Sequence, residues 1–227
     1  RTMESIELND WNDVSNYIDN GFLTIKPSWF EHIIQHQGSY PRDAFTKGQM
    51  ASKSWLLGEL YKIVPLRPHV TVCMLGSWIG SIVDPLHRAL TIQRIYGLDM
   101  DANAVELSEK LNQKYVQDNW KFKGVVADVS NLDSSNMQFE TSGELITVKP
   151  DWIINTSCEH MDTNWFKSAD NDQLIIMQSN NSSDFDGHIN PCKDIEDFRI
   201  KYPLEKTHYV GQLVTPAYTR FMQIGYK

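Results

Sequence analysis

From residue 69 onward the sequence alternates between short β-rich runs and helical runs, and this order constrains the fold more than any other feature. Strands that alternate with helical patterns are typical of a parallel sheet with crossover helices. The runs that we predict as strands are 69–75, 94–99, 122–128, 151–157 and 173–179. Helical patterns lie between or after them, at 102–114, 162–168 and 193–202.

The chain closes with two further β-rich runs, 206–215 and 218–227, which are separated only by Pro216 and Ala217. Such a short link favours antiparallel pairing over another crossover. Residues 130–149 are polar and irregular, so we expect a loop or a small insertion there. The sequence therefore predicts a doubly wound α/β fold, with a mostly parallel seven-stranded sheet and an antiparallel C-terminal strand.

The first 65 residues carry mainly helical signals. Asp10 can cap a short helix, Ser28 begins a capping box, and a third helical run ends at Pro65. We therefore divide the chain into an N-terminal helical extension or lid, residues 1–65, and a Rossmann-like domain, residues 66–227.

Composition restricts the partners and the compartment. There are 21 Lys and Arg against 29 Asp and Glu, and the net charge of −8 makes nucleic acid an unlikely partner. Cys73, Cys158 and Cys192 are far apart and lack metal-ligand spacing, so we expect neither disulfides nor a metal site, and the cytoplasm as the compartment. The longest largely apolar run, about fourteen residues, is too short to span a bilayer, so we expect a soluble protein with no membrane partner.

Small or polar residues end all five predicted parallel strands. They are Gly76-Ser77, Asp99, Asp128, Asn155-Thr156-Ser157 and Gln178-Ser179. Ligands of open α/β sheets bind just beyond the carboxyl ends of the strands. Glycine lets a ligand approach the backbone closely, and a carboxylate such as Asp99 can accept hydrogen bonds from both hydroxyls of a ribose. The pattern indicates a nucleoside cleft, although Asp101 can simply interact with a helix N-terminus and Asp128 can belong to an ordinary turn.

Five segments, VTVCMLGSWIG, IYGLDMD, VVADV, WIINTSCEHM and TRFMQIGYK, carry a family resemblance. In order and spacing they resemble the motifs of class I S-adenosylmethionine-dependent methyltransferases, of the small-molecule type. The resemblance covers roughly residues 66–227. Two departures concern the first motif, where Met74 replaces an acidic residue and Trp78 replaces the middle glycine.

The resemblance implies S-adenosylmethionine as the cofactor. It places the glycine loop beside the cofactor, the acidic residue after the second strand on the ribose and the one after the third strand on the adenine. The cofactor-binding residues that we predict on this basis are Gly76, Ser77, Trp78, Gly80, Asp99, Met100, Asp128, Val129, Asn155, Thr156 and Ser157.

The SCEHM segment resembles the Glu-His step that follows the fourth strand in small-molecule methyltransferases. We predict His160 as a general base for an acceptor that must lose a proton, with Glu159 orienting it or contacting a ligand. His160 can instead be a structural imidazole bonded to a backbone carbonyl. Cys158 is expected to be a small buried packing residue rather than a nucleophile.

Two further segments can complete the site. Gln49, Ser52 and Lys53 share one face of a predicted helix, and Lys53 is predicted to lie over the carboxylate end of the cofactor, although this face can also be merely solvated. The loop after the fifth strand can shape an acceptor pocket through Asn180, His188 and Asn190, or can be a plain surface loop.

The function that we predict is in-line methyl transfer from S-adenosylmethionine to a small-molecule acceptor. The sulfonium is already a good leaving group, so the protein mainly aligns the reactants and excludes water. Alternatives are an aminopropyl or aminocarboxypropyl transferase, an NAD-dependent dehydrogenase, or a non-catalytic nucleoside-binding regulatory module. Neither the acceptor nor the oligomeric state follows from the sequence.

Overall fold

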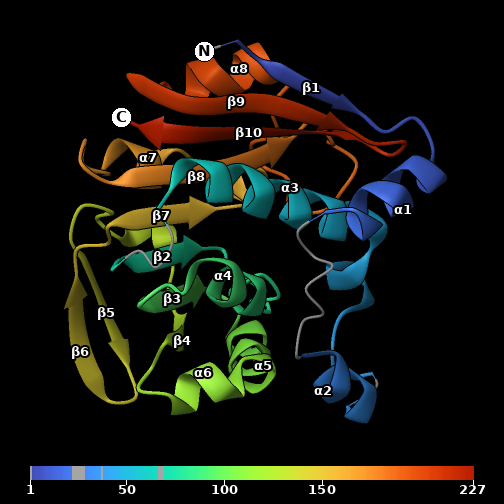
Figure 1. The fold of residues 1–227 in the computed structure, drawn as a ribbon. Coiled ribbons are helices and arrows are strands. Elements are labelled where there is room, and N and C mark those ends of the chain that lie inside the picture. The colour runs from blue at the N-terminus through green and yellow to red at the C-terminus, as the bar shows by residue number, and fades with distance from the viewer. Residues whose placement is uncertain (1, 22–28, 37, 66–68) are drawn as a thin grey trace.

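Within the residues that it describes, this computed structural model has a main sheet of eight strands, in the order β1-β9-β10-β8-β7-β2-β3-β4 (Figure 1). The structure describes residues 2–21, 29–36, 38–65 and 69–227. The strands are Glu4–Glu7 (β1), Thr71–Leu75 (β2), Arg94–Asp99 (β3), Phe122–Val126 (β4), Trp152–Asn155 (β7), Leu174–Asn180 (β8), Lys206–Val214 (β9) and Thr219–Tyr226 (β10). Strands β4, β3, β2, β7 and β8 run parallel, whereas β10 is antiparallel to both β8 and β9. The predicted α/β fold with an antiparallel C-terminal strand is confirmed.

The eighth strand, β1, was not expected from the sequence, which predicts seven strands and a helical N-terminal segment. β1 pairs in parallel with β9 at the edge of the sheet, with Glu4 opposite Gly211 and Glu7 opposite Val214. It is only four residues long and largely exposed, so it has no apolar run that would reveal it. Its position depends on backbone pairing with a strand about 200 residues away, which a local pattern cannot indicate.

Residues 130–149, expected as a loop or small insertion, contain a β-hairpin. Its strands are Met137–Thr141 (β5) and Glu144–Val148 (β6), and Ser142 and Gly143 form the turn with positive φ angles of 51° and 75°. Met137 and Phe139 are buried, and Phe139 meets the Tyr96 ring of β3 with a centroid separation of 5.3 Å. The hairpin thus connects β4 to β7 in the chain, where a crossover helix would be usual, and it covers part of one face of the sheet.

Six of the described helices lie close to predicted runs, whereas the helix Val83–Leu90 was not predicted and Gln113–Gln117 lies mostly beyond the predicted run 102–114. The described helices are Trp11–Asp19 (α1), Trp29–Gln35 (α2), Lys47–Ile63 (α3), Val83–Leu90 (α4), Ala102–Leu111 (α5), Gln113–Gln117 (α6), Asn164–Lys167 (α7) and Ile195–Lys201 (α8), with 3-10 turns at Arg42–Phe45 (η2), Val129–Asn131 (η3) and Cys158–His160 (η4). Asp10 caps α1 as predicted, by accepting from the backbone N–H groups of Asn12 and Asp13. Ser28, the other predicted cap, lies outside the described residues.

Successive side chains of each central strand point to opposite faces of the sheet, so the core has two layers. In β2, Val72 and Met74 face one side, where they join the buried residues of α3 and α4, while Cys73 and Leu75 face the side covered by α7 and α8. Figure 1 shows α3 and α4 in front of the sheet and α7 and α8 behind it. Burial of both faces explains the nearly continuous apolar runs of the central strands. None of the described helices is long and apolar enough to cross a membrane.

Candidate functional site

A cavity of about 660 Å³ opens at the carboxyl ends of the parallel strands. Of the residues predicted to bind the cofactor or to act in catalysis, the structure brings all to it except Gly80 and Asn155. Those that line it are Lys53, Gly76, Ser77, Trp78, Asp99, Met100, Asp128, Val129, Thr156, Ser157, Glu159 and His160. Segments predicted from separate parts of the sequence therefore share one space.

The loop after β2 is shaped by its backbone. Gly76 has a φ of +62°, and a Cβ atom there would lie 3.1 Å from the Met161 methyl and 3.3 Å from the Ser157 Cβ. Trp78 also has a positive φ, of 49°, and its backbone N–H donates to Oδ2 of Asp99 at 2.8 Å. Glycine at 76 therefore keeps the wall of the cavity open and provides a backbone conformation that other residues rarely adopt.

Asp99 and Asp128 combine local structural roles with positions at the cavity. Besides Trp78, Asp99 accepts from the backbone N–H of Asp101 through Oδ1 at 3.0 Å. Asp128 accepts from the backbone N–H of Ser130 and from the side-chain amide of Asn131, so it also has the turn role that was the alternative for it. A carboxylate has about four acceptor positions, so both groups retain capacity for a ligand.

Asp101 interacts with a helix N-terminus, which was one of the two roles expected for it. Its carboxylate caps α5 by accepting from the backbone N–H groups of Asn103 and Ala104. It is not among the residues that line the cavity.

Gly80 and Asn155 support the site from behind. Gly80 faces α5, where its carbonyl accepts from the Asn112 side chain at 3.0 Å and an added Cβ would lie 3.1 Å from the same amide. Asn155 is fully buried, and its Oδ1 accepts from the backbone N–H of Ser157 at 2.9 Å. The sequence pattern places both residues next to the lining but does not tell which way each one faces.

Helix α3 closes one side of the cavity with Gln49 and Lys53. The Lys53 ammonium donates to Oε1 of Gln49 at 3.0 Å. Burial, together with the smaller effect of the Arg220 charge, lowers the pKa of Lys53 to about 7. Ser52, predicted on the same face, instead donates to the Gln178 side chain at 2.9 Å and fixes α3 to β8.

A buried polar cluster surrounds Glu159. Its Oε1 accepts from the Asn180 amide at 2.9 Å and lies 3.7 Å from a guanidinium nitrogen of Arg220. Arg220 also donates to the backbone carbonyl of Thr156 at 3.3 Å. Arg220 was not predicted from the sequence, although a charged residue inside the largely apolar strand β10 was a signal for it.

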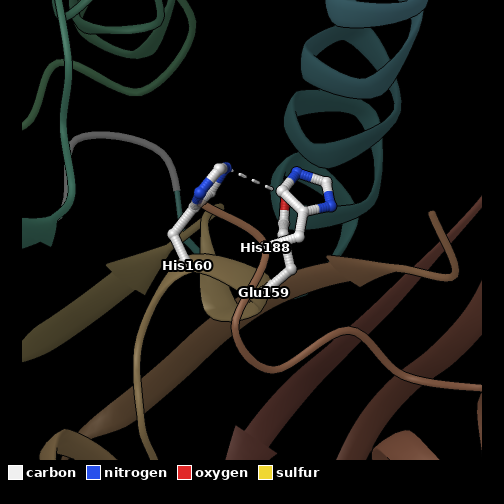
Figure 2. Close-up of side chains that lie close together, drawn as sticks. All are labelled: Glu159, His160 and His188. Atoms are coloured by element: carbon white, nitrogen blue, oxygen red, sulfur yellow. Dashed lines mark ion pairs between the residues drawn. The ribbon is translucent and has the colours of Figure 1, made fainter. Parts of the chain in front are cut away.

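His160 and His188 face each other across the same part of the cavity (Figure 2). Their rings meet edge to face, with centroids 4.5 Å apart, and Nε2 of His160 lies 3.9 Å from Oε1 of Glu159. Nδ1 of His160 is 3.0 Å from the carbonyl of Gly187, the structural bond considered as the alternative for this residue. Its other nitrogen remains directed towards Glu159.

The loop after β8 contributes Asn180 and His188 to the cavity, as predicted, but not Asn190. The Asn190 side chain donates to the carbonyl of Met161 and to the Tyr202 hydroxyl, both at 3.2 Å, and so anchors the loop. Other lining residues were not predicted from the sequence. Among them are Asp43, Thr46, Phe185, Asp186 and Tyr218.

Cys158 is buried and lies outside the lining, as expected for a packing residue. Burial is the main cause that raises the pKa of its thiol well above the ordinary value, and the neighbouring Glu159 carboxylate adds to it. Such a thiol is a poor nucleophile because the thiolate is the reactive form.

No protein-family model matches the chain, and no curated protein sequence matches it either. Solved structures do. The N-methyltransferase NodS from Bradyrhizobium japonicum, in complex with S-adenosylhomocysteine, has a TM-score of 0.58 at 10% identity, covering 88% of this chain and 98% of its own. Magnesium protoporphyrin IX methyltransferase (ChlM) from Synechocystis, with bound S-adenosylmethionine, has a TM-score of 0.54 at 15% identity, covering 97% and 99%. At these identities the likeness is one of fold.

Proposed function

We propose that the protein is an S-adenosylmethionine-dependent methyltransferase for a small-molecule acceptor, starting from the finding that it has the fold of class I S-adenosylmethionine-dependent methyltransferases. One observation carries the proposal. Asp99 from the end of β3, Asp128 after β4 and Lys53 from α3 line a single cavity. These groups match the ribose, adenine and carboxylate of the cofactor in chemical type.

The adenosine part of the cofactor would lie between the loop after β2 and the ends of β3 and β4. Asp99 would accept the ribose hydroxyls, and Asp128 would accept from the adenine amino group. Gly76 supports this fit, because a side chain there would project towards Met161 and Ser157, which line the cavity. Bound there, S-adenosylmethionine supplies a methyl group on a sulfonium that is an excellent leaving group.

The amino-acid part of the cofactor would face α3. Lys53 would pair with its carboxylate, and Gln49 already positions the Lys53 ammonium. Asp43 lines the same cavity and would pair with the cofactor's ammonium group, in place of the acidic residue that is absent at Met74. Because the two charges of the cofactor's amino acid differ in sign, this division would also fix its orientation.

The acceptor would occupy the part of the cavity lined by Asn180, Phe185, His188, Glu159 and His160. Methyl transfer requires alignment of the acceptor atom, the methyl group and the sulfur, together with exclusion of water. His160 would take the proton from an acceptor that must lose one, with Glu159 orienting it. The cavity volume of about 660 Å³ lies within the range of small-molecule sites.

Within residues 1–65 we also propose α3 as a lid over the cavity of residues 66–227, because it supplies Lys53 and Gln49 to the lining, whereas β1 of the same segment belongs to the main sheet. A cytoplasmic location is supported by three free, buried cysteines, which fit a reducing compartment. The net charge of −8 supports a small molecule over nucleic acid as the partner.

Calorimetric titration tests the proposed cofactor. We expect micromolar binding of S-adenosylmethionine and S-adenosylhomocysteine, weakened in Asp99→Ala, and no binding of NAD. The matched control is Asp101→Ala, which removes a helix cap outside the lining. Binding of NAD alone would contradict the proposal and support a dehydrogenase.

Transfer itself is tested with S-adenosylmethionine that carries an isotopically labelled methyl group. The protein is incubated with fractionated small-molecule pools, and labelled product and S-adenosylhomocysteine are measured together. We expect both to form in equal amounts. Cofactor binding without transfer to any pool would instead support a regulatory module, and transfer of another part of the cofactor would support an aminopropyl or aminocarboxypropyl transferase.

A further inference from the structure

We propose that Glu159, His160 and His188 form a binding site for one divalent transition-metal ion beside the proposed cofactor site. Figure 2 shows the three side chains turned towards one another, and one potential ligand atom from each lies within 4.8 Å of the other two. No metal site was expected from the sequence, where the three cysteines lack metal-ligand spacing. His188 lies far along the chain from the adjacent Glu159 and His160, so spacing does not reveal this set. The fold brings them together by placing η4 against the loop after β8.

Backbone carbonyls orient both histidine rings so that Nε2 is the nitrogen left for a metal ion. Nδ1 of His160 lies 3.0 Å from the carbonyl oxygen of Gly187, and Nδ1 of His188 lies 2.6 Å from that of Ser182. A carbonyl oxygen only accepts hydrogen bonds, so each Nδ1 is the donor and carries the proton. In a neutral ring this leaves a lone pair on Nε2. A hydrogen bond from the other ring nitrogen to a backbone carbonyl is the usual outer-shell support of a metal-binding histidine.

Glu159 supplies a buried carboxylate with unused capacity. Its residue is only 2% exposed, and its Oε2 has no hydrogen-bond partner among the described residues. The other oxygen, Oε1, is held by the Asn180 amide at 2.9 Å and lies 3.9 Å from Nε2 of His160. A neutral Nε2 and a carboxylate oxygen are both electron-pair donors. They repel each other at this separation, and a metal ion between them would remove that repulsion. Arg220, 3.7 Å from the same Oε1, compensates part of the carboxylate charge but offers no group that bridges it to the imidazole.

The donor set selects the class of metal. Two imidazole nitrogens and one carboxylate oxygen suit Zn²⁺ or Fe²⁺, whereas Mg²⁺ and Ca²⁺ prefer oxygen ligands alone. Ligand atoms on one tetrahedral zinc ion lie roughly 3.4 Å apart, as bond lengths of about 2.1 Å require. Binding therefore needs the two imidazoles to close in slightly. The His160 side chain is 44% exposed and His188 lies on a loop, so both have room to move.

The site would keep a free coordination position. All three residues line the cavity, so the ion would face the space assigned above to the acceptor. A three-ligand site with an open position binds a substrate oxygen or nitrogen. This last step rests on the proposed function, and it narrows the acceptor to compounds with a metal-binding oxygen or nitrogen. In the loaded protein, Nε2 of His160 binds the ion and no longer accepts a proton.

The test is calorimetric titration of Zn²⁺ into the full chain after treatment with a chelator, with Co²⁺ as a spectroscopic probe. We expect one ion per chain and visible absorption from bound Co²⁺. His160→Ala and His188→Ala should each weaken binding at least about 100-fold, since loss of an outer-shell partner alone costs roughly 10- to 100-fold. His69→Ala, an exposed histidine outside the cavity lining, is the matched control and should bind as the parent does.

Absence of binding, or equal binding by the parent, His160→Ala and His188→Ala, would overturn the proposal. The proposal would also fail if the parent protein bound no ion and NMR showed protons on both Nδ1 and Nε2 of His160, as expected for an imidazolium paired with Glu159. S-adenosylhomocysteine binding is measured on the same samples. Metal binding without S-adenosylhomocysteine binding would reject only the proposed cofactor, and the reverse result would reject only the metal site.

Discussion

The backbone N–H of Trp78 donates a hydrogen bond to the Asp99 carboxylate across 2.8 Å, and this bond joins the loop after β2 to the end of β3. The second oxygen of Asp99 is fixed by the N–H of Asp101. The carboxylate is therefore held in place by two backbone groups before any ligand arrives. A preorganised carboxylate loses little freedom when a ligand binds to it.

Asp99→Ala should weaken S-adenosylhomocysteine binding roughly 10- to 100-fold, because hydrogen bonds to a charged group contribute about 1.5–3 kcal/mol. Asp99→Asn should have a smaller effect, since its amide oxygen still accepts one of the backbone hydrogen bonds. Dissociation constants from calorimetry check both values. Equal affinities of parent and Asp99→Ala would show that the carboxylate does not contact the ligand.

The pKa of Lys53, lowered to about 7, predicts a pH dependence of cofactor binding. A bound carboxylate would favour the protonated amine and raise this pKa. Affinity for S-adenosylhomocysteine should therefore be constant below about pH 7 and fall as the pH rises above it, by up to about tenfold per pH unit. Binding at pH 8 should take up a proton, measurable as a heat that depends on the buffer.

Lys53→Met keeps the aliphatic length of the side chain and serves as the matched comparison. It should bind S-adenosylhomocysteine more weakly than the parent at pH 6 and lose the proton uptake. Proton uptake that persists in Lys53→Met would assign the pH dependence to another group.

Gly97→Ala should destabilise the protein by about 1–3 kcal/mol through overpacking. A Cβ atom at residue 97 would lie 2.9 Å from both the Phe122 ring and the Ser77 hydroxyl. Urea unfolding measures the loss, and Val126→Ala at an exposed end of β4 is the control, with an expected change below about 0.5 kcal/mol. Unchanged stability of Gly97→Ala would show that β3 and the loop after β2 separate easily.

The native protein should resist thiol reagents near neutral pH. All three cysteines are free and buried, and burial raises the pKa of each thiol. Titration with a chromogenic disulfide should show little reaction in minutes, and three reactive thiols per chain after addition of denaturant. Rapid reaction of one thiol in the native state would indicate a local opening of the core.

The sequence predicted the elements that depend on local patterns. The five parallel strands and their polar ends follow from apolar runs and turn residues, so Asp99 and Asp128 were found correctly at strand ends. Features that depend on distant pairing were missed. β1 is stabilised by the backbone of β9, and the meeting of Glu159 with Arg220 and His188 depends on how separate segments fold together. Gly80 and Asn155 show a third limit. Their spacing in the sequence predicted that they lie next to the cavity, but it did not predict that they face away from it.

Strand β1 covers one end of β9 at the border of the sheet. Without residues 2–9, the four β9 residues that β1 pairs with, Gly211–Val214, would present unpaired backbone donors and acceptors on that side. Exposed edges of this kind recruit strands from neighbouring molecules. The two glutamates of β1 place negative charge along the border that it forms, and like charges on two copies disfavour their pairing at this edge.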